Sequence, residues 1–309
     1  MEMGKPQKDP SDRASPARMG TIAAFATYGM WGLFPLYWKR LEAIDPFQVL
    51  SHRVVWAALF TVILLAWSGG LSKLLALLGN WRRLGAAALA AALVTTNWAV
   101  YIWAVDQGHI VQSALGYYIN PLVSMALGAI LLREKLDRFT LVAIGIATAG
   151  VIAATLMLGS PPWISLVLAF SFGFYGLVKK RAALEPMTGL AAETLAATPF
   201  ALAYLVFRHA EGQGAFGGAD VGATILLALA GPVTAIPLLT FAFSANRITL
   251  QKLGFIQYVS PSLQLLLGLL VYRESLSPAL LVAFVAVIAA VLIYALSRGR
   301  TEGAAAKVA

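Results

Sequence analysis

Long apolar stretches separated by short polar connections run along almost the whole chain, and this pattern decides its class. A helix needs about 20 mostly apolar residues to cross a bilayer core of about 30 Å. Ten stretches come close to this length: 19–37, 47–68, 84–105, 110–132, 139–158, 162–178, 188–207, 222–244, 253–272 and 279–297. The pattern therefore predicts an all-α membrane protein with ten transmembrane helices.

The remaining segments fit around these spans. Residues 1–18 and 298–309 are expected to form polar tails. The stretch 69–83 is too short to cross the bilayer, so it is expected to lie along the membrane surface as an amphipathic helix. A Gly-Ser-Pro-Pro turn signal at 159–162 separates the fifth span from the sixth.

Composition excludes the soluble classes. Hydrophobic residues make up 60% of the 309 residues and charged residues only 12%, whereas an ordinary soluble domain carries roughly 25% charged residues. Intrinsic disorder needs the opposite balance of low hydropathy and dense charge. The chain has no Cys and only three His, so no disulfide, metal centre or other cofactor is expected.

The positive charges predict the orientation. If the N-terminus is cytoplasmic, 18 of the 23 Lys and Arg residues fall on cytoplasmic segments and four on the opposite loops. This asymmetry predicts that both termini are cytoplasmic. It also explains the net charge of +9 by contacts with membrane lipids, without a nucleic-acid partner.

The second half of the chain repeats the first at an offset of 140 residues. The offset superposes Tyr118 on Tyr258, Pro121 on Pro261, and Arg133-Glu134 on Arg273-Glu274. This predicts two five-helix repeats, 19–158 and 159–297. Because five is odd, the second repeat must enter the membrane from the other side, and such inverted repeats are typical of secondary transporters with a solute path between the halves.

Several motifs resemble those of a known family. They are Asn97-Trp98, Tyr101 to Val105, Ser113 to Pro121, Gly231 to Leu238, Gly254 to Tyr258, and Pro261. Together they resemble the RarD family of EamA-type transporters, within the drug/metabolite transporter superfamily. The resemblance implies two inverted EamA-like halves in the bacterial inner membrane, and it implies no particular substrate.

Polar side chains at membrane depth are the candidate substrate-binding residues. Tyr117 and Asn120 share one face of the fourth span with two serines, and the 140-residue offset relates this stripe to Gln257 and Gln264 of the ninth span. Asn97 and Tyr101 share a face of the third span and extend the set. Unpaired amides in hydrocarbon cost several kcal/mol, so these groups must face either a wet cavity or a neighbouring helix. Hydrogen bonding between helices is the alternative to solute binding.

Two charges and two prolines are the candidates for gating or coupling. Arg53 and Glu193 occupy equivalent positions of the two halves, each about 8–9 Å from opposite membrane surfaces by helical rise, which leaves a gap of about 13 Å. Each is expected at one mouth of the path, although Arg53 could instead extend to the outer headgroups. Glu193 is the candidate for carrying a coupling proton. Pro121 and Pro261 are expected to kink their helices mid-span, either as gates or as static kinks.

These features together predict a transporter of a small metabolite or drug-like solute that works by alternating access. A membrane-embedded enzyme is one alternative, but the sequence contains no HExxH or G-x-S-x-G motif and no pair of intramembrane carboxylates. A channel is the other, but the chain offers no ring of charges and no repeated filter loop.

Overall fold

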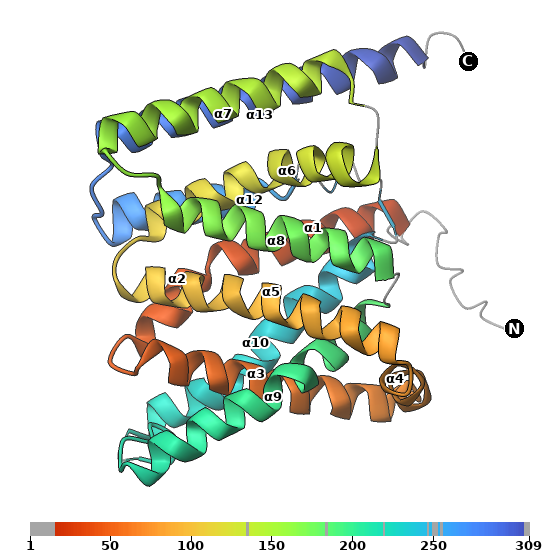
Figure 1. Cartoon of the computed structure of the whole chain (residues 1–309), viewed down its shortest axis with the longest axis vertical. Helices are drawn as coiled ribbons and strands as arrows, with labels where there is room; N and C mark the ends of the chain where they lie inside the picture. Colours follow the sequence, from red (N-terminus) through yellow and green to blue (C-terminus); the bar gives the residue numbers. More distant parts are fainter. Residues whose placement is uncertain are drawn as a thin grey trace, which may run out of the picture.

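The computed structural model describes residues 16–305 apart from 134–135, 183–184, 219, 246, 249–252 and 254–255. This part of the chain is helical and contains no strand (Figure 1). Its elements are α1 (Pro16–Gly32), α2 (Phe34–Trp38), the 3-10 helix η2 (Lys39–Leu41), α3 (Pro46–Trp67), α4 (Leu71–Leu78), α5 (Trp81–Asp106), α6 (Ile110–Leu132), α7 (Arg138–Leu158), α8 (Trp163–Ala182), α9 (Pro186–Ala210), α10 (Val221–Ala245), α12 (Val259–Leu266), the π-helix η3 (Leu267–Val271) and α13 (Pro278–Ala305).

The all-α class is confirmed. Six helices within the described residues are long and apolar enough to cross a membrane, namely α3, α5, α6, α7, α9 and α10. Three shorter apolar helical segments cover Trp163–Lys179, Val259–Val271 and Pro278–Tyr294. The first predicted span divides at Leu33 into α1 and α2, and a proline stands in the first turn of α2, where its missing N–H leaves no hydrogen bond unmade. The count of ten spans stays a prediction.

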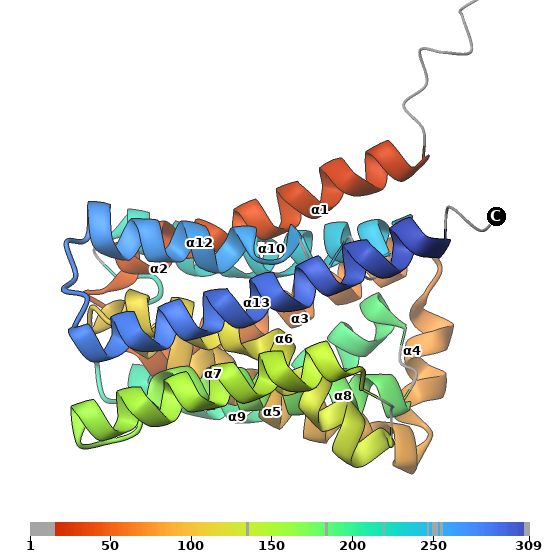
Figure 2. The ribbon, with the colours of Figure 1, turned by 90° about the horizontal axis from the view of Figure 1, so that it is seen from above.

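The helices lie side by side in one bundle, with the short α4 running across one end of it (Figures 1 and 2). This matches the amphipathic helix expected within 69–83. The larger packing partners are α7 with α13, α3 with α9, α6 with α12, α6 with α8, α5 with α8, α1 with α10, α3 with α10 and α5 with α9. In each of the first three pairs, the two helices occupy equivalent places in the two predicted repeats.

Polar residues at the helix starts explain where several helices begin. The Asp45 carboxylate accepts hydrogen bonds from the amides of Phe47 and Gln48 at the start of α3, and Asn80 caps α5 in the same way. The cap of α6 comes from far along the chain. Glu274 follows η3 in sequence, and its carboxylate accepts from the backbone N–H groups of Ile110 and Val111 at 2.8 Å each.

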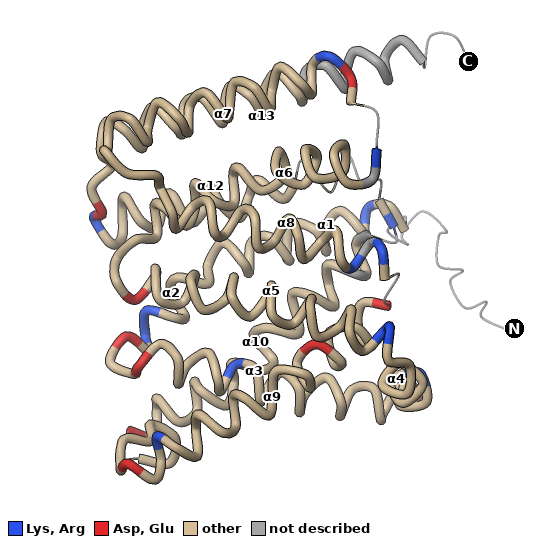
Figure 3. The backbone as a smooth tube through the Cα atoms, in the orientation of Figure 1, with Lys and Arg blue, Asp and Glu red and all other residues tan. Residues whose placement is uncertain are grey.

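Charged residues gather at the two ends of the bundle, and the ends differ (Figure 3). The end called here the basic end is where α1 and α7 begin and where α3, α6 and α8 end. In or beside the helix ends there lie Arg18, Lys73, Arg82, Arg83, Arg133, Arg138, Lys179, Arg181 and Arg247. The opposite end, called here the acidic end, carries Lys39, Arg40, Arg208 and Arg273 beside its helix ends, together with most of the Asp and Glu side chains that the structure describes. Lys and Arg are therefore more numerous at the helix ends on one side of the bundle, and the predicted orientation rests on this difference in positive charge.

Helix α10 is continuous although it contains two prolines. Gly231, Pro232 and Pro237 suggest an interrupted eighth span, but α10 is one helix through all three residues. Gly231 instead serves close packing, because a Cβ atom there would overlap the backbone oxygen of Trp56 in α3. Only glycine allows the backbones of α3 and α10 to approach this closely.

Candidate functional site

A cavity of about 490 Å³ lies inside the bundle. Its walls come from α1, α2, α3, α5, α6, α8, α9, α10 and α12, and aromatic side chains contribute much of the lining. Nine of the ten predicted site residues line it: Arg53, Asn97, Tyr101, Tyr117, Asn120, Pro121, Gln257, Pro261 and Gln264. Glu193 is absent from the lining, but its carboxylate contacts two lining residues, Tyr175 and Lys179.

The cavity is exposed toward one end of the bundle. Among its lining residues, Ser124, Gly176 and Pro186 are exposed, and each lies in the part of its helix near the basic end. Toward the acidic end, Phe34 and Tyr101 are 8% and 2% exposed. At the acidic end, called here the sealed end of the cavity, these lining residues are therefore buried.

Asn97 is largely occupied by contacts between helices. Its amide nitrogen donates to the carbonyl oxygen of Leu168 at 2.9 Å and to the hydroxyl of Ser171 at 3.0 Å, both on α8. Its oxygen accepts a weak bond from the Tyr117 hydroxyl at 3.4 Å. Asn97 is only 1% exposed, so it joins α5 to α8 at the cavity wall and leaves Tyr117 as the more available group.

The amides of α6 and α12 are less constrained. Asn120 accepts one hydrogen bond, from Ser124 of its own helix at 3.1 Å. Gln264 donates to the carbonyl oxygen of Trp31 on α1 at 3.2 Å, but its own side-chain oxygen is buried and has no hydrogen-bond partner among the described residues. A buried acceptor without a donor is costly, so a bound molecule would relieve it.

The two prolines differ in their surroundings. Pro121 lies inside α6, as expected. Pro261 is in the first turn of α12, directly after the turn at Gln257 and Tyr258, and the Gln257 carbonyl accepts from the N–H of Ser260 at 3.2 Å. The predicted span 253–272 is therefore interrupted just before Pro261, and a first-turn proline removes no intrahelical bond.

Equivalent residues of the two predicted repeats meet beside the cavity. The rings of Tyr118 and Tyr258, which the 140-residue offset superposes, stack with their centroids 5.8 Å apart. The Tyr118 hydroxyl also lies 2.6 Å from that of Ser262. Contacts between equivalent residues are what a two-fold axis between the halves would produce.

Arg53 is buried at the inner limit of the cavity. It is 4% exposed, and its guanidinium carbon lies 4.0 Å from the ring centroid of Trp98 and 4.9 Å from that of Trp38. Its Nε donates to the hydroxyl of Thr234 on α10 at 3.0 Å. Arg53 does not extend to the headgroups, because aromatic rings and α10 hold it in the interior.

Glu193 forms an ion pair that no sequence pattern indicates. One carboxylate oxygen lies 2.9 Å from the ammonium nitrogen of Lys179, and the other accepts from the hydroxyl of Tyr175 at 3.0 Å. Lys179 and Tyr175 are one turn apart on α8 and line the cavity, while Glu193 on α9 lies behind them and is 1% exposed. The only available signal for Lys179 was its place beside the sixth span, four residues after Tyr175.

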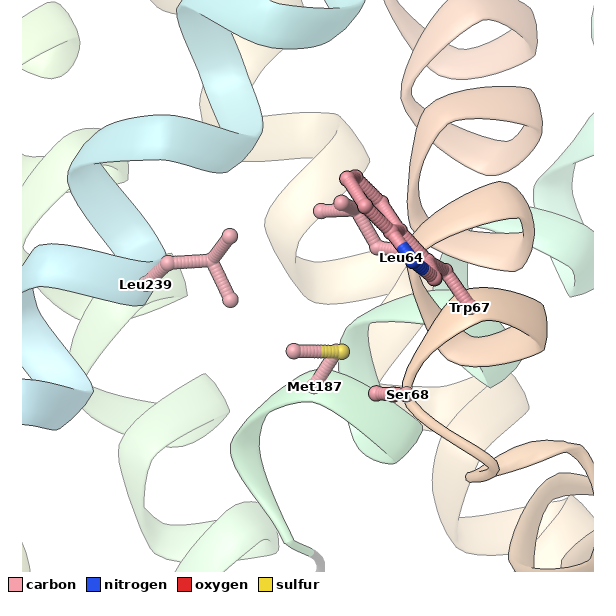
Figure 4. Close-up of a pocket in the computed structure, with 5 residues that line it drawn as sticks. All are labelled: Leu64, Trp67, Ser68, Met187 and Leu239. Atoms are coloured by element: carbon pink, nitrogen blue, oxygen red, sulfur yellow. The ribbon is translucent and has the colours of Figure 1, made fainter.

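A second hollow, of about 360 Å³, lies at the surface of the bundle near its basic end. Leu64, Trp67 and Ser68 of the α3 end, Met187 of α9 and Leu239 of α10 line it (Figure 4). Trp67 is 88% exposed, and the lining offers only one hydroxyl and one indole N–H as polar groups, so this hollow suits lipid rather than a polar solute. Among the described residues no three His, Asp or Glu side chains gather as metal ligands would.

Comparison with known proteins places the chain among transporters. It is 45% identical to the uncharacterized transporter YojE of Bacillus subtilis, over 91% of this chain and 95% of that one. It is 42% identical to the protein RarD of Streptomyces exfoliatus, over 94% and 95% of the two chains. It is 37% identical to the protein RarD of Escherichia coli, over 94% and 98%.

A solved crystal structure shares the fold. It superposes with a TM-score of 0.59 at 18% sequence identity, over 90% of this chain and 96% of the other. The sequence profile of the EamA-like transporter family matches twice, over residues 18–156 and 162–296. The chain therefore belongs to the EamA-like transporter family, as a RarD-type member and a multi-pass membrane protein.

Proposed function

We propose that this chain is a secondary transporter that moves a small solute across the bacterial cytoplasmic membrane by alternating access. The observation that carries the proposal is the central cavity, which is exposed toward the basic end and sealed toward the acidic end. A cavity that is open to one side only is what a carrier presents in each of its two access states. A channel would need a path open to both ends at once.

Two inverted repeats of five helices, 19–158 and 159–297, would provide the two access states. The packing pattern supports this division, because exchanging each helix for its equivalent converts the α5–α8 contact into α10–α1 and the α3–α10 contact into α9–α5. The two matches to the family profile, at 18–156 and 162–296, divide the chain at the same turn. Rocking one half against the other would then close the basic end and open the acidic end.

The orientation proposed from charge makes the basic end cytoplasmic, with both termini on that side and ten spans in all. The excess of Lys and Arg at this end supports it. The cavity is then open to the cytoplasm. Its polar lining, from Tyr101, Tyr117, Asn120, Gln257 and Gln264, would contact the solute, with Asn97 holding the wall. Arg53 would act at the sealed end, Glu193 near the open end, and Pro121 inside α6.

Cysteine accessibility tests alternating access without knowledge of the substrate, because the chain has no cysteine of its own. Ser260 lines the cavity and is 7% exposed, so Ser260→Cys introduces one deep reporter. In membrane vesicles of either orientation, we expect a membrane-impermeant maleimide to label this cysteine from both sides. The unsubstituted protein serves as the blank.

If the maleimide labels the cysteine in only one of the two vesicle orientations, the cavity is accessible from one side of the membrane only, and alternating access is refuted. Planar-bilayer recordings of the purified protein complete the test, since a carrier shows no unitary conductance steps. Resolved steps would identify a channel instead.

A further inference from the structure

The lining of the cavity carries an unbalanced positive charge. Its only formally charged residues are Arg53 and Lys179, and it includes no Asp or Glu. Lys179 is neutralised by Glu193 at 2.9 Å. Among the residues that the structure describes, no carboxylate forms an ion pair with Arg53, so its charge lies in the interior without a counter-ion.

Arg53 also keeps unused hydrogen-bonding capacity. Its Nε is bonded to Thr234, whereas its Nη1 is buried and has no partner within the described part of the chain. The same is true of the hydroxyl of Tyr101, which lines the same end of the cavity at 2% exposure. Leaving such donors unpaired in the interior is unfavourable unless something occupies them for part of the time.

The aromatic rings around Arg53 do not replace a counter-ion. Trp98 and Trp38 stabilise the cation through their ring faces and hold the guanidinium in one orientation. A planar guanidinium fixed in this way is suited to binding a carboxylate with two parallel hydrogen bonds. The remaining walls are mostly aromatic and apolar, so they suit an apolar body attached to that group.

We propose that the transported solute is an organic anion, and that Arg53, assisted by the Tyr101 hydroxyl, binds its carboxylate at the sealed end of the cavity. This inference rests on the proposed transport function and specifies the substrate class. A cationic solute would find no unpaired carboxylate in the lining. A neutral solute would leave the charge of Arg53 uncompensated.

Thermal unfolding of the purified protein in detergent tests the binding step. The probes are aromatic and aliphatic monocarboxylates, each paired with its neutral amide: benzoate with benzamide, indole-3-acetate with indole-3-acetamide, and hexanoate with hexanamide. Ligands that bind the folded state raise the unfolding temperature. We expect at least one carboxylate to raise it in a saturable way while its amide does not.

Three variants identify the group responsible. Arg53→Gln should weaken carboxylate binding about tenfold to a hundredfold, the usual loss for a charge-assisted hydrogen bond, and Arg53→Lys should weaken it less. Tyr101→Phe keeps the ring and removes only the unpaired hydroxyl, so it should weaken binding without lowering the unfolding temperature of the ligand-free protein. Arg208→Gln, at an arginine outside the cavity that pairs with Glu211, is the matched control and should bind as the wild type does.

The ligand-free unfolding temperatures separate a binding role from a structural one. An uncompensated buried charge destabilises the empty protein, so Arg53→Gln should unfold at the same or a higher temperature than the wild type. The inference is overturned if no carboxylate shifts the unfolding temperature, if the amides shift it equally, or if Arg53→Gln and Tyr101→Phe keep the full response.

Counterflow in liposomes distinguishes failure of this inference from failure of the proposed function. Saturable counterflow of a carboxylate that also raises the unfolding temperature supports both. Carboxylate binding without counterflow overturns the transport function, and of this inference it leaves only the carboxylate-binding site at Arg53. Counterflow of benzamide or tryptamine that none of the carboxylates inhibits overturns the anion proposal and leaves transport intact.

Discussion

The ion pair between Glu193 and Lys179 leads to a prediction about both stability and transport. The pair joins α9 to α8 beside the mouth of the cavity, with 2.9 Å between charged atoms. The Tyr175 hydroxyl donates to the same carboxylate at 3.0 Å and accepts from Lys179 at 3.0 Å. The informative changes are Glu193→Gln and Lys179→Met, made singly and together.

The two single changes should differ in magnitude. Removing one partner of a buried ion pair usually costs about 3–5 kcal/mol. Lys179→Met leaves a carboxylate whose side chain is fully buried, so we expect a loss of about this size. Glu193→Gln keeps an acceptor for Tyr175, and the Lys179 side chain is 22% exposed and can reach water. We therefore expect a loss of only about 1–2 kcal/mol from that change.

The double variant isolates the interaction between the two charges. Its loss of unfolding free energy should be at least about 1 kcal/mol smaller than the sum of the single losses. Denaturant unfolding in detergent, followed by tryptophan fluorescence, measures all three variants. The chain supplies a matched control in Lys73 and Glu185, which pair at 3.6 Å with side chains 68% and 49% exposed. An exposed pair of this kind should show a coupling of about 0.5 kcal/mol or less. Equal coupling in the two cycles would refute the reasoning.

The transport consequence follows from the same geometry. If transport is coupled to protons, Glu193 is the carboxylate that binds one, because burial makes its charged form costly whenever Lys179 moves away. Glu193→Gln imitates the protonated form, so the variant should keep substrate exchange and lose uptake driven by a pH gradient. Proton-driven transport at the wild-type rate by a folded Glu193→Gln protein would leave this residue a purely structural role.

Three further predictions address topology, the amides and the cap of α6. Reporter fusions after Leu136 and Leu276, which the 140-residue offset relates, should report opposite compartments, and a shared compartment would exclude inverted repeats. Asn97→Leu should destabilise the protein by about 1–3 kcal/mol, because it removes two hydrogen bonds that join α5 to α8. Gln257→Leu, at a side chain with no hydrogen bond in the described structure, should impair transport at nearly unchanged stability in the same unfolding assay. Glu274→Leu removes the acceptor for two amides of α6 and should cost about 1 kcal/mol, measured against Glu274→Gln, which keeps an acceptor.

The apolar pattern could predict the helices because a helix in lipid must be long and apolar. Both properties can be read from one contiguous stretch of sequence. The predicted spans at 47–68 and 110–132 correspond closely to α3 and α6. Breaks within helices were harder, since they depend on neighbours. Pro261 lies in a first turn rather than in mid-helix, and Pro232 is accommodated inside α10. The predicted tails and the loop copy at Glu134 lie largely outside the described residues.

The positions of the polar residues at the cavity were predictable from the sequence, but their hydrogen-bond partners were not. Periodicity assigned Asn97 and Gln264 to inward faces, and both line the cavity. Their hydrogen-bond partners are a carbonyl on α8 and one on α1, which no spacing within the chain indicates. Whether a polar side chain finds a hydrogen-bond partner depends on how the helices pack. The sequence alone therefore left solute binding and hydrogen bonding between helices as alternatives. In Asn97 the bridging contacts predominate.

In an inverted repeat, equivalent sequence positions of the two halves lie near opposite ends of the bundle. The two intramembrane charges illustrate this. Arg53 and Glu193 each follow the first proline of their helix by seven residues, Pro46 in α3 and Pro186 in α9. The helices run antiparallel, because Tyr204 late in α9 bonds to Asp45 before α3, and Glu185 before α9 pairs with Lys73 after α3. Each charge therefore lies about 10 Å from opposite ends of the bundle by helical rise. Equivalent positions thus place an unpaired cation at the sealed end of the cavity and a neutralised pair at its open end. If the halves exchange conformations during transport, the contacts that now seal the acidic end around Arg53 must loosen as those around Glu193 tighten. A solute carboxylate bound to Arg53 would favour that exchange to the extent that it binds the second state more tightly.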